Sequence, residues 1–312
     1  MDYQAAMGKT IDLHIHSNFS EDADLSVEEI FKSACNLPLS AISITDHDSI
    51  ESLEVARSIS PKYDIEYVPG VEITSVLPVD GSQQHILGYF IDEKNNDLIN
   101  ALDRIKKSRI LITNKRIEML QNLGFAMNEE RIWDMTGGRS PTATSIMVEI
   151  FDNEKNFNDA RLYEYFYGDK KDDKLGSFYR EYLIEGKPAY VPFQTIDIKE
   201  AVEIIKKADG IPVLAHPKFV KKREWLDQIR GYGIEGIEAI STYHTPEDRK
   251  FYLEYAMKNS LLITSGSDFH GPTAKPKVKL GGISGNDYSL LQKIKDFYVS
   301  IMNTSYQPMP DR

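Results

Sequence analysis

The chain has 312 residues, of which 41% are hydrophobic and 27% charged, and this composition excludes an intrinsically disordered protein. Its formal net charge of -11 argues against binding of long nucleic acid through a broad basic face. No apolar run approaches membrane-spanning length, and the first residues do not resemble a secretory signal. We therefore expect a cytoplasmic protein with no membrane partner. The single cysteine, Cys35, agrees with this, and we expect it in the core.

The first part of the chain alternates short strands with a helix. Residues 11–16 alternate apolar and polar side chains, which predicts a strand. Ser26 opens a capping-box pattern, so we expect a helix over residues 26–36. Further strands are expected over residues 39–45, 65–74 and 85–90.

The middle of the chain breaks this rhythm. Residues 95–192 contain a long predicted helix (97–123) and further helical pieces, so we predict a helical insertion subdomain. The strand and helix alternation then resumes, with elements at 196–208, 211–215, 234–240 and 261–264. Such alternation indicates parallel strands with helices outside, closed into a barrel or left as an open sheet. The predicted α/β barrel therefore comprises residues 1–94 and 193–312.

The positions of the histidines are the main functional signal. None of the seven lies between residues 86 and 215, and six lie at predicted strands or in the turns that follow. Residues at the carboxyl ends of parallel strands converge on one face of a barrel. Glu72 ends a strand, and Asp268 lies two residues before the last histidine. Imidazole and carboxylate together suit Zn²⁺, Mn²⁺ or Fe²⁺. The candidate histidines are His14, His16, His47, His85, His216 and His270.

Close spacing strengthens this prediction at two places. His14 and His16 share one face of a strand with Asp12, and two imidazoles so close together would be costly to bury without a metal ion. Asp268 and His270 have the same spacing of two residues. The seventh histidine lies just before a predicted helix, and two roles are open for it, in the structure of the capping loop or in substrate contact. It is His244.

Six short motifs together resemble the polymerase-and-histidinol-phosphatase (PHP) superfamily, and the resemblance covers nearly the whole chain. The insertion and the stretch 187–192 are similar to the branch of PHP phosphoesterases that act on nucleotides and short oligoribonucleotides. The motifs are His14-Ile15-His16-Ser17, Thr45-Asp46-His47-Asp48, Pro69-Gly70-Val71-Glu72-Ile73, His85-Ile86-Leu87-Gly88, Leu214-Ala215-His216-Pro217 and Gly266-Ser267-Asp268-Phe269-His270.

The resemblance implies a distorted seven-stranded β/α barrel that holds two or three divalent ions, Mn²⁺, Fe²⁺ or Zn²⁺. The first ion is expected on His14, His16, Glu72 and Asp268. Glu72 would bridge to a second ion on His85 and His216. A third ion would take His47, His270 and an acidic residue. Many members have Ser-Asp-Gly where this chain has one extra residue, so the acid is Asp22 or, as the alternative, Glu21.

The expected chemistry is metal-assisted hydrolysis of a phosphoester, in which a hydroxide that bridges two ions attacks phosphorus. Glu72, Asp46 and His270 form the expected catalytic set. For Asp46 two roles are open, orientation of the neighbouring His47 or support of a turn. The expected substrate is a small phosphorylated compound, such as AMP, a nucleoside 3′,5′-bisphosphate or a short oligoribonucleotide.

Arginines of the insertion are candidate substrate contacts, because the planar guanidinium binds two phosphate oxygens at once. Arg109 and Arg116 lie seven residues apart on one face of the long helix, where they would contact phosphate or form a solvated edge. Arg139, in the Gly-rich loop, is a further candidate. Relatives in this branch often carry a histidine at the position of Thr142, so the substrate of this chain is expected to differ from theirs if that histidine contacts substrate.

Two other functions compete with phosphoester hydrolysis. Metal-dependent amidohydrolases also place paired histidines on a first strand. A non-catalytic metal-binding PHP module is the second alternative, as found where such domains degenerate within polymerases. Retention of all six ligand histidines favours an enzyme over a degenerate module.

Overall fold

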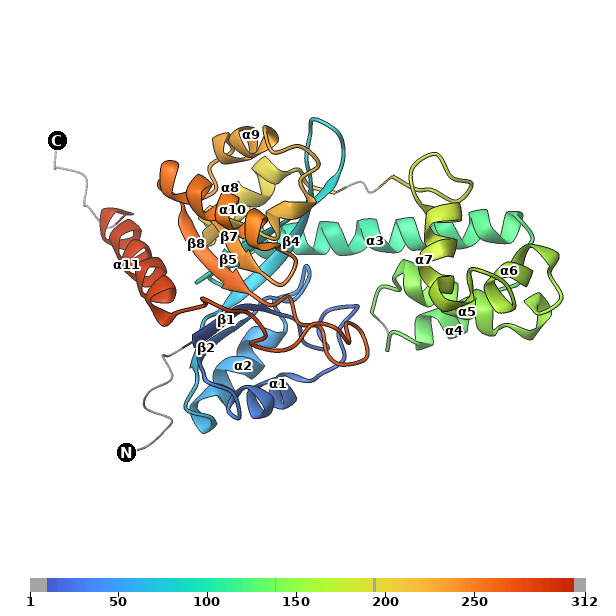
Figure 1. Cartoon of the computed structure of the whole chain (residues 1–312), viewed down its shortest axis with the longest axis horizontal. Coiled ribbons are helices and arrows are strands. Elements are labelled where there is room, and N and C mark those ends of the chain that lie inside the picture. Colours follow the sequence, from blue (N-terminus) through green and yellow to red (C-terminus); the bar gives the residue numbers. More distant parts are fainter. Residues whose placement is uncertain (1–9, 138, 193–194, 306–312) are drawn as a thin grey trace. The chain divides into compact units, whose positions relative to one another are not determined.

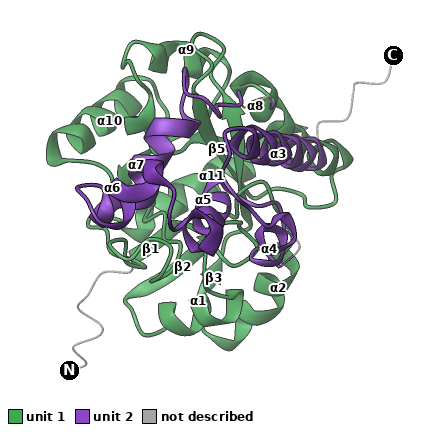
Figure 2. Cartoon of the chain, turned by 90° about the vertical axis from the view of Figure 1, so that its right-hand side faces the viewer, with its two compact units in different colours: residues 1–102, 196–312 green, residues 103–195 purple. Residues whose placement is uncertain are grey.

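The chain forms two compact units, and the computed structural model describes residues 10–137, 139–192 and 195–305. Unit 1 comprises residues 1–102 and 196–312, and unit 2 comprises residues 103–195 (Figure 2). Each unit has its own hydrophobic core. None of the described helices combines the length and the apolar character needed to cross a bilayer.

Unit 1 is a mixed α/β fold built on two sheets (Figure 1). One sheet has the order β1-β2-β3 and the other the order β4-β5-β6-β7-β8. The strands are β1 (Thr10–Ile15), β2 (Leu39–Ile44), β3 (Glu66–Tyr67), β4 (Gly70–Val76), β5 (Gln83–Tyr89), β6 (Ile211–Leu214), β7 (Gly236–Ser241) and β8 (Leu262–Gly266).

Strand β5 runs antiparallel to both of its neighbours, β4 and β6, whereas all the other pairs are parallel. The expectation of parallel strands throughout was therefore wrong for β5. The reason is the connection between β4 and β5, residues 77–82, which is too short for the crossover that a parallel pair requires.

Two isolated bridges join the sheets to each other. Ile15 pairs with Phe269, just after β8, and His47 pairs with Glu72 of β4. At the first bridge the backbone N–H of His16 donates to the carbonyl of Phe269 over 2.8 Å. Both bridges lie at predicted metal ligands, so the path of the backbone itself brings these residues together. The two sheets do not form one continuous hydrogen-bonded ring among the described residues, and closure into a seven-stranded barrel stays a prediction.

Helices cover the sheets of unit 1. Helix α1 begins at the predicted capping box, where the Ser26 side chain accepts from the N–H of Glu29, whose carboxylate accepts from the N–H of Ser26. Apolar side chains of α1 and α2, including Phe31, pack on the three-stranded sheet at Ile42 and Ile44. The helices of unit 1 are α1 (Val27–Ala34), α2 (Ser52–Ile59), α8 (Ile198–Lys207), α9 (Trp225–Gly231), α10 (Pro246–Lys258) and α11 (Tyr288–Ser305).

The alternation of β1 separates two kinds of interior. Ile11 and Leu13 join an apolar cluster that includes Leu291 of α11. The polar residues of the same strand are equally buried, since Asp12 and His14 have 0% exposed surface. Glu72 of β4 and Glu238 of β7 are also fully buried, and they belong to this second region, which forms the candidate site.

Cys35 is exposed, contrary to the expectation of a core residue. The buried positions of α1 are Val27, Ile30, Phe31 and Ala34, which follow the helical period and leave position 35 off the packed face. Cys35 is the C-cap residue of this helix, and its thiol donates to the carbonyl of Lys32.

Unit 2 is helical in its described residues. Helix α3 (Asn96–Asn122) starts in unit 1 and continues into unit 2, whose other helices are α4 (Glu129–Asp134), α5 (Ala143–Asp152), α6 (Tyr163–Phe166) and α7 (Lys174–Phe178). Its core is rich in aromatic rings, among them Phe125, Phe151 and Phe178. Thr142 is the N-cap of α5, and its hydroxyl accepts from the N–H of Ser145.

Candidate metal centre

The predicted ligands of unit 1 lie within six strands or in the turns that follow them. Glu72 was expected to end a strand, but it is the third residue of β4. β1 and β2 lead to His16 and His47, β4 and β5 carry Glu72 and His85, β6 leads to His216, and β8 leads to Asp268 and His270. His14 lies within β1 itself. The structure brings all these side chains together in one buried cluster.

Glu72 lies at the centre of this cluster and is fully buried. Its Oε2 is 3.2 Å from His14 Nε2, 3.2 Å from His16 Nε2 and 2.9 Å from His47 Nδ1. Its other oxygen, Oε1, is 3.0 Å from a ring nitrogen of His85 and 3.0 Å from Nε2 of a further histidine. One carboxylate therefore faces two separate groups of imidazoles, one with each oxygen. That further histidine is His216.

The most buried group of donors is formed by His14, His16, Glu72 and Asp268, whose ligand atoms lie within 4.8 Å of one another. Asp268 Oδ1 is 3.4 Å from His14 Nε2 and 3.1 Å from His16 Nε2. These facing atoms are buried, yet none of them makes a hydrogen bond within the described part of the chain. Buried polar atoms are costly without partners, and four lone pairs directed at one point are what a divalent cation requires.

Hydrogen bonds fix the tautomers of three histidines. Nδ1 of His14 lies 2.9 Å from a carboxylate oxygen of Glu238, and Nδ1 of His270 lies 2.9 Å from the carbonyl oxygen of Asp268. Since these partners accept only, each Nδ1 carries the proton. His16 Nδ1 lies 3.0 Å from a serine hydroxyl that already donates to Asp46, so this nitrogen is a donor too. In all three rings Nδ1 is therefore engaged, and Nε2 is the nitrogen that faces the cluster.

A third group of donors lies toward the surface. Ring nitrogens of His16, His47 and His270 come within 4.8 Å of one another. Asp22 Oδ2 is 3.5 Å from His270 Nε2 and 3.9 Å from His47 Nε2. Asp22 lines the cavity over these rings, and the choice between it and Glu21, the alternative acid, stays a prediction.

Strained backbone holds two of the candidate ligands. His216 has φ 27° and Asp268 has φ 57°, in the left-handed region that side chains other than glycine rarely adopt. The N–H of His216 donates to Glu238 Oε2 over 2.8 Å, and the N–H of Asp268 donates to the His14 carbonyl over 2.8 Å. Such strain persists where surrounding bonds over-determine the conformation, and it clusters at functional sites.

The charges of the cluster favour a cation. Burial alone would raise the pKa of Glu72, but the neighbouring histidines, His14 first among them, hold this pKa well below its usual value. Burial and the neighbouring His270 and His47 lower the pKa of His16 to about 3. Burial would also lower the pKa of His14, but three carboxylates, Glu72 foremost, hold it well above its usual value. The cluster thus holds buried anions and attracts positive charge, which metal ions would supply.

The donor set therefore fits metal ions, because imidazoles held through Nδ1 and buried carboxylates are gathered at one place. A family model described as the PHP domain matches residues 12–138. This part of the chain is a PHP domain. The family predicted from the six motifs is thereby confirmed.

Relatives of this PHP protein match along most of its length. A 3′,5′-nucleoside bisphosphate phosphatase from Chromobacterium violaceum is 27% identical, over 84% of this chain and 87% of its own. A 5′-3′ exoribonuclease from Haemophilus influenzae is 28% identical, over 85% of this chain and 92% of its own. A solved structure described as an amidohydrolase from Chromobacterium violaceum, with bound SO4 and no metal, shares the fold with a TM-score of 0.75. It is 24% identical and covers 92% of this chain and 96% of that one.

Residues that the sequence analysis missed surround the PHP cluster. Glu238 is fully buried on β7 and binds His14 and the backbone of His216 with its two oxygens. Tyr243 donates its hydroxyl proton to Asp268 Oδ2, and Lys275 lies 2.7 Å from the same oxygen. The alternation of the predicted strand 234–240 offered a signal for Glu238, because it puts a carboxylate between apolar residues. No motif pointed to the other two.

Asp46 is fully buried. It accepts hydrogen bonds from the N–H and hydroxyl of Ser17, at 2.7 Å each, and from the hydroxyl of Ser20 at 2.9 Å. Ser20 in turn contacts Nδ1 of His16 and accepts from the N–H of His47. Asp46 therefore reaches Nδ1 of His16 and the backbone N–H of His47 through a serine hydroxyl. Orientation of the His47 ring by Asp46 stays a prediction.

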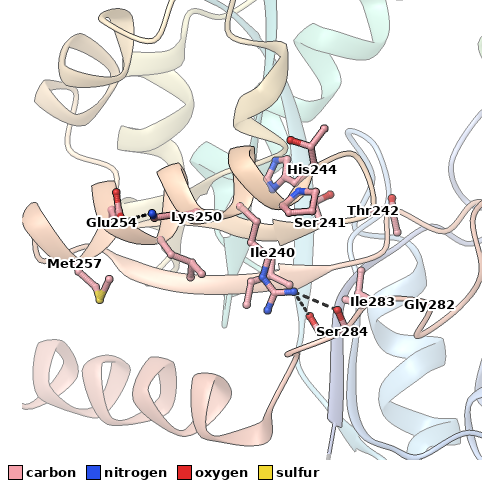
Figure 3. A pocket seen from close by; sticks show the side chains of 14 residues that line it. Ile240, Ser241, Thr242, His244, Lys250, Glu254, Met257, Gly282, Ile283 and Ser284 are labelled. Atoms are coloured by element: carbon pink, nitrogen blue, oxygen red, sulfur yellow. Dashed lines mark hydrogen bonds and ion pairs between the residues drawn. The ribbon is translucent and has the colours of Figure 1, made fainter.

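The cluster opens to solvent through a cavity of about 310 Å³. Its lining comprises Asp22, His47, Gln83, His85, His216, Phe219, Tyr243, Asp268 and Lys275. His244 lies elsewhere in unit 1, on a groove of about 620 Å³ beside α10 (Figure 3). There its Nδ1 donates to the carbonyl of Ala239 over 3.0 Å. A substrate contact by His244 stays a prediction.

The three candidate arginines belong to unit 2. Arg109 and Arg116 are both partly buried on α3, and Nε of Arg116 has no hydrogen-bond partner among the described residues. Burial lowers the pKa of Arg116, and the nearby charge of Arg109 lowers it further. Arg139 bonds to the carbonyl of Thr136 through Nε. Their contacts with substrate stay predictions.

Proposed function

We propose that this PHP protein is a metal-dependent hydrolase of phosphoric esters, and that its substrate is a nucleotide or a short oligoribonucleotide. The observation that carries the proposal is the buried cluster around Glu72 Oε2. This oxygen, Nε2 of His14 and His16, and Oδ1 of Asp268 face one another, and none of the four has a hydrogen-bond partner among the described residues. The predicted class of enzyme, a phosphoric ester hydrolase, is also the class of the named relatives, a nucleotide phosphatase and an exoribonuclease.

The proposed ligands are assigned to three positions. His14, His16, Glu72 and Asp268 would hold a first ion, and Glu72 with His85 and His216 would hold a second. His47 and His270 would hold a third with Asp22, which the short distances favour over Glu21. Bound Mn²⁺, Fe²⁺ or Zn²⁺ would supply a water of lowered pKa and a Lewis acid for the phosphoryl oxygens.

Two further carboxylates, Glu238 and Asp46, orient the proposed metal ligands. Glu238 holds the ring of His14 and the backbone of His216, so that both histidines face Glu72. Asp46 holds His16 through the hydroxyl of Ser20. The proposed catalytic set is therefore Glu72 and His270 at the cluster, with Asp46 as a residue that positions a ligand.

Finer features of the fold and substrate site are part of the same proposal. We infer that the two sheets form the distorted seven-stranded barrel and that residues 95–192 are an insertion that carries substrate contacts. Arg109, Arg116 and Arg139 would bind phosphate oxygens there. Support comes from Arg116, which is partly buried on α3. Burial first, and then the charge of Arg109, lowers the pKa of Arg116, so a bound anion would stabilise its charged form. Thr142, which caps α5, would not supply the side chain that a histidine gives at this position.

The function is tested by a substrate panel. Protein loaded separately with Mn²⁺, Fe²⁺ and Zn²⁺ is assayed on AMP, adenosine 3′,5′-bisphosphate, histidinol phosphate and short 5′-phosphorylated RNA, with dipeptides and cyclic amides as the competing class. We expect phosphate or nucleotide release from the nucleotides or RNA. Hydrolysis of amides alone would make the chain an amidohydrolase, and tight metal binding without any hydrolysis would make it a non-catalytic module.

A further inference from the structure

Lys275 lies at the rim of the cavity that opens onto the metal cluster. Its ammonium is 2.7 Å from Asp268 Oδ2 and 3.0 Å from the hydroxyl of Tyr243. The side chain is 33% exposed, whereas that of Asp268 is 4% exposed. An ammonium has three N–H donors, so two are engaged by these groups and a third remains for a molecule in the cavity.

The charge of Lys275 is unusual for its place. Of the described residues that line this cavity, it is the one lysine or arginine, and it stands among the carboxylates of Asp22 and Asp268. Glu72 lies buried in the same cluster. Because carboxylates repel a phosphoryl dianion, a fixed cation at the entrance offsets part of that repulsion and gives the anion a hydrogen-bond donor.

The loop that carries Lys275 is held in place by the carboxylate of Asp24. One oxygen of this carboxylate, Oδ2, accepts from the N–H of Thr273 over 2.6 Å and from the N–H of Ala274 over 2.9 Å. Gly271 has φ 103°, and a Cβ there would lie 2.6 Å from the same oxygen. The loop over residues 271–275 therefore requires glycine at its first position and the carboxylate of Asp24 against its backbone. These contacts fix the position of the Lys275 ammonium before substrate binds.

We propose that Lys275 is a substrate-binding residue, whose ammonium donates a hydrogen bond to an oxygen of the substrate's phosphoryl group. Asp24 is a positioning residue that acts through the loop 271–275. The inference rests on the proposed phosphoesterase function and adds to it a cation from the chain itself, on the solvent side of the metal ligands. It names a requirement on the substrate, namely a phosphoryl group that enters beside Tyr243 and Asp268.

The test compares Lys275→Gln, Lys275→Arg and the control Lys277→Gln, which removes the same charge from an exposed position two residues away. Binding of inorganic phosphate to the metal-loaded protein is measured by titration calorimetry, beside kcat, KM and metal content. For Lys275→Gln we expect phosphate affinity and kcat/KM to fall about 10- to 100-fold, the size expected for loss of one charge-assisted hydrogen bond. Metal content should stay unchanged, Lys275→Arg should recover most of the loss, and Lys277→Gln should match the wild type.

Two results would overturn the inference. One is wild-type phosphate affinity and kcat/KM in Lys275→Gln. The other is a fall in phosphate affinity that is accompanied by a fall in metal content in Lys275→Gln, because the lysine would then act only by supporting Asp268. Asp24→Ala should weaken phosphate binding by a smaller factor in the same direction, and Lys275→Gln added to it should bring the loss to that of Lys275→Gln alone. Wild-type protein that hydrolyses no phosphoester would refute the proposed function separately, since the phosphate titration needs no turnover.

Discussion

At the scale of single residues, the cluster depends on side chains that hold the rings of others. Glu238 binds two histidines at once, one through Nδ1 and one through its backbone N–H, and both of its oxygens are accepting. An amide in its place would turn one accepting atom into a donor that faces a donor. This role differs from that of Glu72, whose oxygens face the Nε2 atoms of His14 and His216.

Glu238→Gln is therefore expected to weaken metal binding by about 10- to 100-fold, the range found for partners that orient metal ligands. Competition with a chromogenic chelator measures the affinity. Glu254→Gln is the matched control, because Glu254 is 61% exposed on α10 and distant in sequence from the ligands. Equal metal affinity in both variants would show that Glu238 does not orient His14.

Glu72→Gln should be more severe. The amide keeps the size of the side chain but cannot bridge two ions as a carboxylate does, so we expect metal content to fall and kcat to drop by more than about 100-fold, beyond the loss for an orienting partner. Elemental analysis of the purified variant and single-turnover assays check the two parts. Retention of full metal content would argue against Glu72 as the central ligand.

The sequence predicted the cluster residues that occur in family motifs, because their types and their places after strands carry chemical information. It did not predict Lys275, which lies in a loop between prolines where no period or motif marks its direction. For Asp46 the sequence left two roles open, orientation of His47 or support of a turn. The bond to His16 through the hydroxyl of Ser20 could not be seen, because it depends on the folded turn.

At the scale of elements, β1 and β8 approach closely at Gly266. A Cβ at this glycine would lie 2.1 Å from Cβ of His14 and 2.5 Å from a carboxylate oxygen of Glu238. The two strands can therefore be neighbours only because position 266 has no side chain. Their contact in turn sets the distance between His14 and Asp268.

Gly266→Ala should thus push β1 away from β8. We expect a loss of stability of about 1 to 3 kcal/mol, as for other overpacked interiors, together with weaker metal binding. Urea unfolding of the metal-free protein measures the first effect and chelator competition the second. Gly231→Ala, at the end of α9 where a Cβ meets nothing within 4 Å, should leave both unchanged. If the two variants behave alike, the close approach is not required.

Sequence reasoning located most strands and the long helix to within a few residues, because amphipathic period and capping residues are local signals. It missed the reversal of β5, although the short connection before that strand was visible. It also misplaced Cys35 in the core, since the apolar run around it was taken as buried to its end, whereas α1 packs only through residues on its helical face.

At the scale of the whole molecule, metal ions should stabilise one unit selectively. The cluster and its ligands lie in unit 1, and unit 2 has a separate aromatic core. Binding to the native state alone stabilises by about 2.7 kcal/mol when the free ion is at 100 times its Kd. Removing the ions should therefore loosen unit 1 before unit 2.

Hydrogen exchange with and without chelator tests this expectation. Peptides of β1, β4 and β8 should exchange faster after chelation, because the buried carboxylates of Glu72 and Asp268 then lose the positive charge of the ions. Peptides of α5 in unit 2 should change little. Uniform acceleration across both units would mean that the ions stabilise the chain as one cooperative body.

The isolated bridges between the two sheets determine when, during synthesis, the site can be completed. One of these bridges pairs Ile15 with Phe269, which are separated by most of the polypeptide. The candidate ligands next to these two residues come together only when this bridge has formed. During synthesis on the ribosome, a growing chain would expose His14 and His16 long before Asp268 emerges to complete their set. Chemical competence would then arrive at a late step of translation, and a prematurely terminated product that lacks β8 would be inert toward any ester.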